Sequence, residues 1–447
     1  MPENTFASLR LLPALQQNLD SLSFTQMTPV QQQCLPLILA GENVVAQAST
    51  GSGKTAAFAL GILQQLQPQL LSPQALVLCP TRELADQVAN EFRRLARTLP
   101  NIKVLTLCGG RPVAVQANSL AHGAHIVVGT PGRVEDHLRR ESLATETIGC
   151  LVLDEADRML DMGFLPSVQS IVASLSAGSK QQTLLFSATY EENIEALAAS
   201  IMPNAVRVQV DSTSSAPDIE ELSYNIGTDS NRQRALETLL RHYQPETALV
   251  FCSTRADVDE VCGRLNHSGI SALGLHGDME QRERDLTMIR FVNGSARVLV
   301  ATDLAARGLD VTGLDLVVNY HPARDPATYT HRIGRTGRAG ARGRACTLTT
   351  DPGVGLELPT ASKVKQPLAA KNVTLLIDAG KRDKIRPGDV VGALTADGRI
   401  TAEQLGKISL MPQYCCVAVV HEQNKRALEI LLEQKLKGKR VRCRILD

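Results

Sequence analysis

The sequence lacks the features that mark membrane, secreted and metal-binding proteins. Its longest stretch without a charged residue, Thr55 to Thr81, holds five glutamines and three prolines, so it does not suit a membrane span. The amino terminus has no basic segment followed by an apolar block, and secretion is therefore not expected. The ten cysteines include no CxxC pair and no metal-type histidine spacing. We expect reduced thiols, a cytoplasmic location and no membrane partner.

The net charge of the 447 residues is only +1, but it is unevenly distributed. Residues 371–447 hold 15 Lys and Arg against 9 Asp and Glu, a balance of +6, which leaves −5 for residues 1–370. A basic tail on a mildly acidic body predicts an anionic partner for the tail, with a merely solvated surface as the alternative. The chain is also too long for one ordinary core, so two or three domains are expected.

Short apolar runs alternate with segments of helical length. The first series is "NVVAQA", "ALVLCP", "KVLTLC", "HIVVGTP", "CLVLDEA" and "TLLFSAT". After residue 245 the pattern returns in "ALVFCST", "SALGLHG", "RVLVATD", "LDLVVNY" and "ACTLTT". Continuous rather than alternating hydrophobicity predicts strands that are covered on both faces, and therefore two tandem α/β domains with parallel sheets.

After residue 370 the pattern changes to strand, helix, two strands, helix and strand. This βαββαβ order predicts a small α+β domain of the kind used by RNA-recognition modules. Polar and proline-marked stretches separate the parts. We predict a first domain over 1–208, a linker over 209–221, a second domain over 222–350, a linker over 351–370 and an RNA-recognition-type domain over 371–447.

A phosphate-binding loop is predicted in "ASTGSGKT", which lies between an apolar strand and a helix expected to begin near Ala56. Backbone N–H groups at such a helix start can surround phosphates, Lys54 can reach their oxygens and Thr55 can hold Mg²⁺. Ala48 stands where the first glycine of this pattern is expected, and an accidental glycine turn is the alternative. The predicted loop comprises Ser49, Thr50, Gly51, Ser52, Gly53, Lys54 and Thr55.

Two acids close the strand "LVLDEAD". Asp154 at the carboxyl end of a strand can hold the Mg²⁺ shell, and Glu155 can orient and deprotonate an attacking water. The alternative is a pair of solvated carboxylates.

The segment "HRIGRTGRAGARGR", from His331 to Arg344, holds five arginines and no carboxylate. Arg335 and Arg338 are three residues apart, so on a helical turn both would point the same way. If the second domain packs against the first, they can reach the γ-phosphate as arginine fingers. The alternative is a basic strip that binds nucleic acid, a role also open to Arg342 and Arg344.

Five motifs together resemble the DEAD-box RNA helicases, in that family's order across about residues 6 to 350. They are "DEAD" at Asp154, "PTRELADQ" at Pro80, "TPGR" at Thr130, "SAT" at Ser187 and "HRIGRTGR" at His331. The resemblance implies two RecA-like domains, ATP and Mg²⁺ as cofactors, and RNA as the partner.

The same resemblance implies individual roles. Phe6 and Gln31 would stack on and read adenine, although Ser23 and Met27 replace the usual Gly and Pro of that motif. Asp310 would bind the ribose, while His331 would support the γ-phosphate network and Ser187 and Thr189 would couple hydrolysis to strand opening. The implied contacts to the RNA backbone are Thr81, Arg82, Gly109, Gly110, Thr130 and Arg133 in the first domain and Gln281, Arg284 and Thr302 in the second.

The tail resembles the RNA-binding module of the bacterial DbpA-type members, in "IDAGKRDKIRPGDVVGALT" and "KLKGKRVRCRIL". Those relatives are directed to a hairpin of large-subunit ribosomal RNA and take part in ribosome assembly. Tyr414 is the only aromatic residue of this tail, so stacking of several bases is not expected. We predict instead a basic RNA-binding surface of Lys381, Arg382, Lys384, Arg386, Lys437, Lys439 and Arg440.

The expected protein is an RNA-stimulated ATPase, monomeric or weakly associating, that unwinds short duplexes of ribosomal RNA locally. Separating four or five base steps costs about 6 kcal/mol at roughly 1.4 kcal/mol each, which favours local melting over long processive unwinding. A different RNA target, a DNA-directed motor of the same superfamily and an ATP-gated RNA clamp remain as alternatives.

Overall fold

The computed structural model describes residues 4–48, 51–175, 181–210, 218–306, 311, 313–337, 343–359, 367–396 and 398–446. The chain divides into two compact units near residue 217. The first unit holds a seven-stranded sheet, and the second holds a six-stranded and a four-stranded sheet. Within the described ranges, no helix has the length and apolar character needed to cross a bilayer. The predicted fold class, two parallel-sheet domains followed by a small α+β domain, is confirmed.

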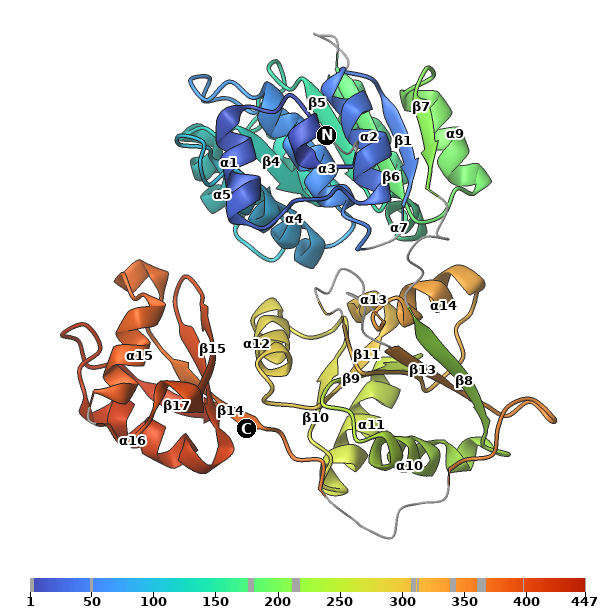
Figure 1. Cartoon of the computed structure of the whole chain (residues 1–447), viewed down its shortest axis with the longest axis vertical. Coiled ribbons are helices and arrows are strands. Elements are labelled where there is room, and N and C mark those ends of the chain that lie inside the picture. The colour runs from blue at the N-terminus through green and yellow to red at the C-terminus, as the bar shows by residue number, and fades with distance from the viewer. Residues whose placement is uncertain are drawn as a thin grey trace. The chain divides into compact units, whose positions relative to one another are not determined.

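The sheet of the first domain has the strand order β3-β4-β2-β5-β6-β1-β7, and every pair is parallel (Figure 1). Its strands are β1 (Val44–Gln47), β2 (Ala75–Leu78), β3 (Val104–Leu107), β4 (Ile126–Gly129), β5 (Cys150–Asp154), β6 (Gln182–Ser187) and β7 (Val206–Gln209). Alternate residues enter two cores: Val44 and Ala46 enter one, and Val45 enters the other. Burial on both faces explains the continuous apolar runs.

Helices cover both faces of this sheet. One face carries α1 (Pro13–Ser21), α2 (Pro29–Leu39), α3 (Lys54–Gln65) and α4 (Arg82–Leu95). The other carries α5 (Val113–Ala121), α6 (Pro131–Arg139), α7 (Ala156–Asp161), α8 (Leu165–Leu175) and α9 (Glu192–Ile201). Each segment between a strand end and the next helix therefore lies at the carboxyl edge of the sheet, where ligands of such folds bind.

The second domain repeats this design with the order β10-β11-β9-β12-β13-β8, again wholly parallel. Its strands are β8 (Ile219–Asn225), β9 (Ala248–Cys252), β10 (Ala272–Leu275), β11 (Val298–Thr302), β12 (Leu316–Asn319) and β13 (Gly343–Thr349). Its helices are α10 (Arg232–Tyr243), α11 (Arg255–His267), α12 (Gln281–Val292), α13 (Asp303–Ala306) and α14 (Pro326–Ile333).

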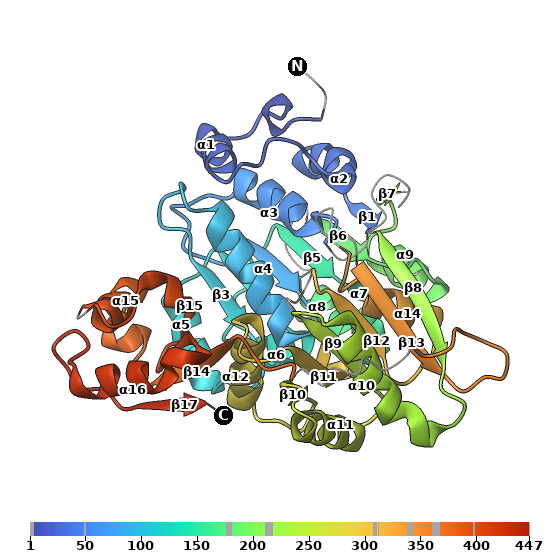
Figure 2. The same ribbon diagram turned by 60° about the horizontal axis from the view of Figure 1, so that its bottom comes forward.

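The C-terminal domain has the predicted βαββαβ order and an antiparallel sheet, β15-β16-β14-β17. Its elements are β14 (Asn372–Ile377), α15 (Pro387–Thr395), β15 (Leu405–Leu410), β16 (Cys415–Val420), α16 (Asn424–Glu433) and β17 (Cys443–Leu446). Both helices pack on one face of the sheet, against Leu375, Ile377, Val417 and Val419 (Figure 2). All ten cysteines of the chain are free thiols.

Two strands, β7 and β8, were missing from the prediction. Both lie at a sheet edge, and polar side chains such as Arg207 in β7 and Glu220 in β8 interrupt their apolar pattern. An edge strand has a neighbour on one side only, and charged residues on it oppose unwanted pairing. Continuous hydrophobicity therefore finds the central strands of both sheets and the edge strands β3 and β10, but not these two edge strands, whose apolar pattern is interrupted.

The two predicted linkers are shorter in the structure. Strand β8 begins at Ile219, inside the predicted linker 209–221, whose residues 211–217 lie outside the described ranges. In the predicted linker 351–370, Leu356 N donates to Ser223 O of β8 at 2.7 Å, and Leu368 lies in the core of the second domain. Parts of that segment therefore contact the second domain, although Val354 and Leu356 remain 48% and 53% exposed; residues 360–366 are not described.

Candidate nucleotide and RNA site

The phosphate loop depends on glycines with left-handed backbone. Gly51 and Gly53 have φ values of 81° and 89°, and a Cβ atom on Gly53 would lie 2.6 Å from Gln31 Nε2. Helix α3 begins directly after this turn, at Lys54 rather than near Ala56 as predicted. Its first N–H groups have no partner within the helix and suit an anion. Ser49 and Thr50 lie outside the described residues.

A buried charge cluster lies at the carboxyl end of β5. Lys54 Nζ is 2.9 Å from Asp154 Oδ1, with 4% and 0% of the two residues exposed. Burial lowers the pKa of Lys54, but Asp154 and Glu155 outweigh it and hold that pKa above its usual value. Burial also raises the pKa of the Asp154 carboxyl, against the attraction of Lys54. The pKa of each group is raised, so each side chain holds its proton more tightly. The cluster therefore favours positive charge.

The structure gives Glu155 a buried partner that sequence reasoning missed. Glu155 has φ 54° and immediately precedes α7. Its Oε2 accepts a hydrogen bond of 2.8 Å from Arg158 Nη1, and both residues are at most 5% exposed. The pair is three residues apart on the chain, a spacing that would have suggested it. Arg158 therefore fixes the rotamer of the carboxylate that we predicted to act on water.

Asp157 links the acidic cluster to the "SAT" loop. Its Oδ2 accepts hydrogen bonds from the backbone N–H groups of Ala188 at 3.1 Å and Thr189 at 3.2 Å. Strand β6 ends at Ser187, directly before these residues. Asp157 is the last residue of the "DEAD" motif, and the sequence alone predicted no role for it. A conformational change around Asp154 and Glu155 can thus be transmitted to the "SAT" loop through the carboxylate of Asp157.

The buried atoms around Asp154 fit a divalent cation. Among the described residues, no side chain donates a hydrogen bond to Asp154 Oδ2, and Ser187 Oγ has no partner. A buried carboxylate oxygen without a donor is costly unless a cation or a ligand compensates it. Mg²⁺ prefers oxygen ligands of this kind and keeps several waters. Thr55, the second predicted ligand, lies on the first turn of α3.

Gln31 ties the predicted adenine motif to the phosphate loop. It forms a capping box with Thr28 at the start of α2, and its Nε2 donates to Gly53 O at 3.0 Å. Phe6 is only 1% exposed, with its ring 6.2 Å from that of Phe24. In this structure Phe6 belongs to the core of the first domain, and its stacking on adenine stays a prediction.

Ser23 shows why glycine is usual in this motif: its φ of 59° lies in the left-handed region. Ser23→Gly should therefore stabilise the first domain by about 0.5 to 1 kcal/mol. Glycine removes the backbone strain of the left-handed conformation, roughly 1–2 kcal/mol, and this gain outweighs the extra entropy that glycine gives the unfolded chain. Chemical denaturation of the full chain measures it. The control Ser21→Gly, at the last residue of α1, should destabilise the domain, because it removes the hydrogen bond from Ser21 Oγ to Asn18 O. Equal destabilisation by both variants would contradict the argument.

The predicted RNA contacts of the first domain meet at the ends of β2, β3 and β4. The guanidinium of Arg82 lies over the glycine pair, since a Cβ atom on Gly109 would be 2.8 Å from Arg82 Nη2. Arg133 Nη1 donates to the backbone oxygen of Arg111 at 2.8 Å. The remaining two predicted contacts start helices: Thr81 caps α4 by accepting from Leu84 N, and Thr130 precedes α6.

The predicted contacts of the second domain also come together. Gln281 and Arg284 lie on the first turn of α12. Arg284 Nη2 donates to Ala305 O at 3.4 Å, and Thr302 Oγ1 accepts from Ala305 N at 3.4 Å. Arg284 and Thr302 are therefore joined through α13. Asp310 lies outside the described residues.

The prediction that one helical turn carries Arg335 and Arg338 is wrong at Arg335. Helix α14 ends at Ile333, and Thr336 forms a bridge with Leu314. Gly337 then takes a φ of 67°, which a continuing helix does not allow. Arg335 is 6% exposed, and His331 lies in the last turn of α14. Arg338 and Arg342 lie outside the described residues.

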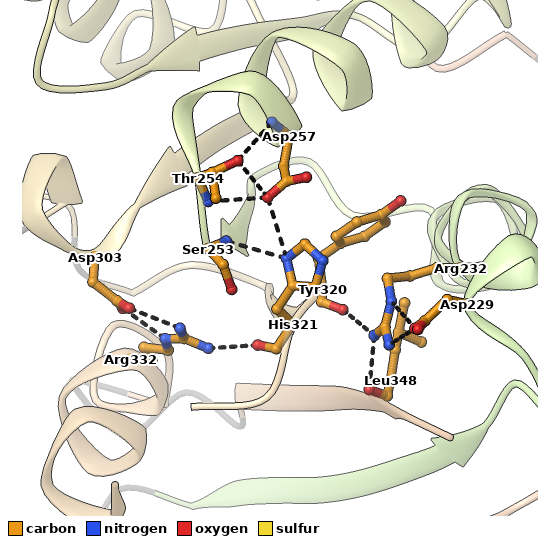
Figure 3. A network of polar contacts seen from close by, with 10 residues as sticks. All are labelled: Asp229, Arg232, Ser253, Thr254, Asp257, Asp303, Tyr320, His321, Arg332 and Leu348. Atoms are coloured by element: carbon orange, nitrogen blue, oxygen red, sulfur yellow. Dashed lines mark hydrogen bonds and ion pairs between the residues drawn. The ribbon is translucent and has the colours of Figure 1, made fainter. Parts of the chain in front are cut away.

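Two arginines of this segment have structural partners instead. Figure 3 shows Arg332 in a bidentate ion pair with Asp303, at 2.7 and 2.8 Å, and hydrogen-bonded to His321 O at 2.8 Å. Arg332 Nη1 also donates to buried Asn319 Oδ1 at 2.9 Å. Arg344 lies on β13, where it pairs with Glu220 at 2.7 Å and stacks over Tyr243. The alternative role of Arg344 in nucleic-acid binding finds no support here.

The Arg332 contacts predict a large effect on stability. Arg332→Lys should lower the free energy of unfolding of the second domain by about 3 kcal/mol, because lysine cannot make the bidentate pair and leaves buried acceptors without donors. Hydrogen exchange of the amides of β9 and β12 in the full chain measures it. The matched control is Arg324→Lys, whose exposed pair with Asp325 should contribute less than about 1 kcal/mol. Similar exchange in both variants would refute this role.

The predicted basic residues of the C-terminal domain gather on one exposed surface. Lys437 Nζ donates to Lys384 O at 2.7 Å, and Lys439 lies 3.8 Å from Asp383, so two segments far apart in sequence meet. The surface, here called the basic cluster, consists of Lys381, Arg382, Lys384, Arg386, Lys437, Lys439 and Arg440, all exposed. Tyr414, in contrast, is 8% exposed and lies under Arg282.

Comparisons with known proteins agree with this arrangement. Three family models match the chain: DEAD/DEAH box helicase over residues 28–197, Helicase conserved C-terminal domain over 231–340, and DbpA RNA binding domain over 374–445. The ATP-dependent RNA helicase DbpA of Escherichia coli K12 is 48% identical, with 99% of each chain covered. The DEAD-box ATP-dependent RNA helicase CshA of Geobacillus kaustophilus is 36% identical, covering 96% of this chain and 87% of the relative.

A solved structure is similar over the two RecA-like domains. Dbp5 of Saccharomyces cerevisiae bound to RNA and ADP BeF3 has a TM-score of 0.70 at 32% identity, and the match covers 78% of this chain and 90% of that one. The matches to these relatives include the two RecA-like domains. The match to DbpA also extends through the C-terminal domain. The chain therefore belongs to the DEAD-box ATP-dependent RNA helicases and carries a DbpA-type RNA-binding domain.

Proposed function

We propose that this helicase unwinds short RNA duplexes locally, in the cytoplasm, and that its C-terminal domain directs it to large-subunit ribosomal RNA during ribosome assembly. The observation that carries the proposal is the buried cluster of Lys54, Asp154 and Glu155, which Asp157 joins to the loop after β6. The residues proposed for hydrolysis and the contact proposed for coupling thus lie at the same edge of the first sheet. The basic cluster supports an RNA target for the C-terminal domain.

In the proposed site the phosphates of ATP lie against the loop from Ser49 to Thr55, with Lys54 on their terminal oxygens. Phe6 and Gln31 hold the adenine, and Asp310 binds the ribose. Thr55 and Asp154 would hold Mg²⁺, which when bound neutralises charge on the phosphate oxygens. Glu155, oriented by Arg158, accepts a proton from the attacking water.

Coupling to RNA is proposed to run through both domains. Ser187 and Thr189 link the first site to strand opening, and His331 supports the γ-phosphate network. Arg335 and Arg338 complete the site when the domains close on RNA. The backbone contacts through Thr81, Arg82, Gly109, Gly110, Thr130, Arg133, Gln281, Arg284 and Thr302 address phosphates and 2′-hydroxyls, so the motor itself is indifferent to base sequence.

The proposal is tested by ATP turnover of the full chain with ribosomal RNA, unrelated RNA and DNA of equal length. We expect strong stimulation by RNA, the lowest KM for large-subunit ribosomal RNA and weak stimulation by DNA. Equal stimulation by DNA would favour the DNA-directed motor. RNA binding that depends on ATP without turnover would favour the clamp, and equal KM for all RNA would point to a different target.

Neutralising the basic cluster should selectively weaken the ribosomal RNA response. The variant Lys381→Gln, Arg382→Gln, Arg440→Gln should raise the KM for ribosomal RNA about tenfold or more and reduce its salt dependence, because each lost phosphate contact removes roughly 0.7 to 0.9 from the logarithmic slope. The control Lys407→Gln, Lys425→Gln removes exposed charge elsewhere on the domain. Equal effects in both variants would contradict the assignment.

A further inference from the structure

A buried glutamine connects two of the segments that carry predicted RNA contacts in the first domain. Gln116 lies on α5 and is 5% exposed. Its Nε2 donates to Cys108 O at 2.9 Å, and its Oε1 accepts from Arg133 Nη1 at 2.7 Å. The same Arg133 nitrogen donates to Arg111 O at 2.8 Å. Because Cys108 and Arg111 stand on either side of the glycine pair 109–110, this chain of hydrogen bonds holds the glycine turn at both ends.

The partners of Gln116 determine which way its amide faces. A carbonyl oxygen such as that of Cys108 only accepts, and the guanidinium of Arg133 only donates. The amide NH2 group therefore faces Cys108, and the amide oxygen faces Arg133. A buried donor or acceptor that loses its partner is costly. A shift of the glycine turn relative to α6 would break one of these bonds, so the two segments are held in one arrangement.

His137 makes a further contact to the amide oxygen. It lies on α6, is fully buried, and its Nε2 is 3.1 Å from Gln116 Oε1. Because that oxygen only accepts, Nε2 must carry the ring hydrogen. The other ring nitrogen, Nδ1, lies 2.7 Å from Ser142 Oγ, whose hydroxyl can turn to donate to it. Burial lowers the pKa of His137, and Arg133 lowers it further, so a neutral ring in this single tautomer satisfies both partners.

Arg133 commits only one of its nitrogens to this network. In the part of the chain that the structure describes, both of its hydrogen bonds come from Nη1. A guanidinium is planar and carries its donors in a fixed geometry, so holding Nη1 also sets the plane in which Nη2 and Nε can meet a phosphate. A group that is already held in its bound conformation loses less freedom when a ligand arrives. The network therefore prepares Arg133 for an RNA phosphate.

We propose that Gln116 is a positioning residue for RNA binding: it keeps the glycine turn and Arg133 in the arrangement that receives the RNA backbone, and His137 keeps Gln116 in place. Gln116 and His137 are buried, so they act through Arg133 and the turn and do not touch RNA. Neither lies within the five helicase motifs of this sequence. The inference deepens the proposed function, because it rests on the RNA contacts proposed there for Arg133 and the glycine pair.

Replacing Gln116 with leucine in the full chain tests this role. The KM for single-stranded RNA of unrelated sequence, measured in ATP turnover at several salt concentrations, should rise about tenfold, with kcat at saturating RNA unchanged. The logarithmic dependence of KM on salt should weaken by about 0.7, because a misplaced Arg133 loses one phosphate contact although the substitution removes no charge. An unchanged KM, or a raised KM with an unchanged salt slope, would overturn the proposal.

The matched control is another buried glutamine of the same domain. Gln182 is 9% exposed, and its Nε2 donates to Ile38 O at 2.9 Å and to Glu42 O at 2.8 Å. It begins β6 and so lies at the opposite edge of the sheet from the glycine turn. Gln182→Leu should lower the thermal stability about as much as Gln116→Leu while leaving the RNA KM and the salt slope unchanged. Equal rises in KM for both variants would assign the effect to stability and overturn the proposal.

A double-mutant cycle shows whether Gln116 acts through Arg133. In the Arg133→Ala background, Gln116→Leu should change the RNA KM by less than about twofold, because residues that act through one another are not additive. Full additivity would exclude the positioning role. Arg133→Ala with an unchanged KM and salt slope would refute the RNA contact of the proposed function, and this inference with it. A raised KM in Arg133→Ala beside a silent Gln116→Leu would refute the positioning role alone.

The part played by His137 is tested by rescue. His137→Leu leaves Gln116 Oε1 without one of its donors and should raise the RNA KM severalfold. His137→Gln offers an amide N–H in place of the imidazole Nε2–H and should return the KM to the wild-type value. Equal KM values in these two variants would show that His137 does not hold Gln116.

Discussion

Replacing Arg335 with alanine should reduce RNA-stimulated ATP turnover by about 10³-fold or more while ATP affinity changes little. In the proposed mechanism its guanidinium stabilises charge on the transferring phosphoryl group, and an arginine in that role typically contributes about 10³ to 10⁵ in rate. Arg335→Lys should not restore turnover, because an ammonium cannot make the same bidentate contact. Steady-state turnover and binding of a fluorescent ATP analogue measure the two effects separately.

The control for Arg335 comes from the same segment. Arg344→Ala removes a structural partner of Glu220 and Tyr243, so it should change stability more than kcat. Because Arg335 is itself 6% exposed, thermal denaturation of both variants must show a folded second domain. Turnover of Arg335→Ala within tenfold of wild type would exclude the finger role. Equal losses in both variants would indicate structural damage.

Glu155→Gln should reduce ATP turnover by about 10²- to 10⁴-fold, which is the usual contribution of a general base. The amide keeps the size of the side chain and can still accept from Arg158, whose bond of 2.8 Å orients the carboxylate. ATP and RNA should therefore still bind, and RNA release should slow because hydrolysis serves release in the proposed cycle. Single-turnover hydrolysis and RNA dissociation after ATP binding measure both.

Two variants show whether the effect belongs to Glu155 itself. Glu192→Gln, at the exposed start of α9, should leave turnover unchanged. Arg158→Ala keeps the carboxylate but removes its buried partner, so it should give a smaller loss of kcat together with an altered pH profile. Unchanged turnover in Glu155→Gln would remove this residue from the mechanism. A loss of ATP binding in Glu155→Gln would indicate a structural role.

Local patterns sufficed for the fold class and for the central strands. A strand between two others in a parallel sheet is apolar on both faces, and its sequence shows this over five or six residues. The glycines of the phosphate loop are equally local, because Gly51 and Gly53 take left-handed backbone angles that other residues rarely adopt. Edge strands such as β7 and β8 lack that pattern, and the segment around Leu356 gave no periodic signal.

The arginine-rich segment shows where local reasoning stops. Its five guanidiniums look alike in sequence, yet Arg332 is bound to Asp303 and Asn319, and Arg344 is bound to Glu220. These partners come from β11, β12 and β8 or the residues directly beside them. Only the sheet order brings them together. The assumption of a helical turn through Arg335 failed because a bridge between Thr336 and Leu314 follows the end of α14.

The sequence by itself determined that this chain forms two parallel α/β domains and a βαββαβ domain, and it located the phosphate loop and the acidic strand end. These features depend on periodicity and on backbone angles, which neighbouring residues dictate. The tertiary structure alone decided that Asp157 reaches the "SAT" loop and that α12 covers the C-terminal sheet. Those contacts join segments that are distant along the chain, and no local pattern encodes them.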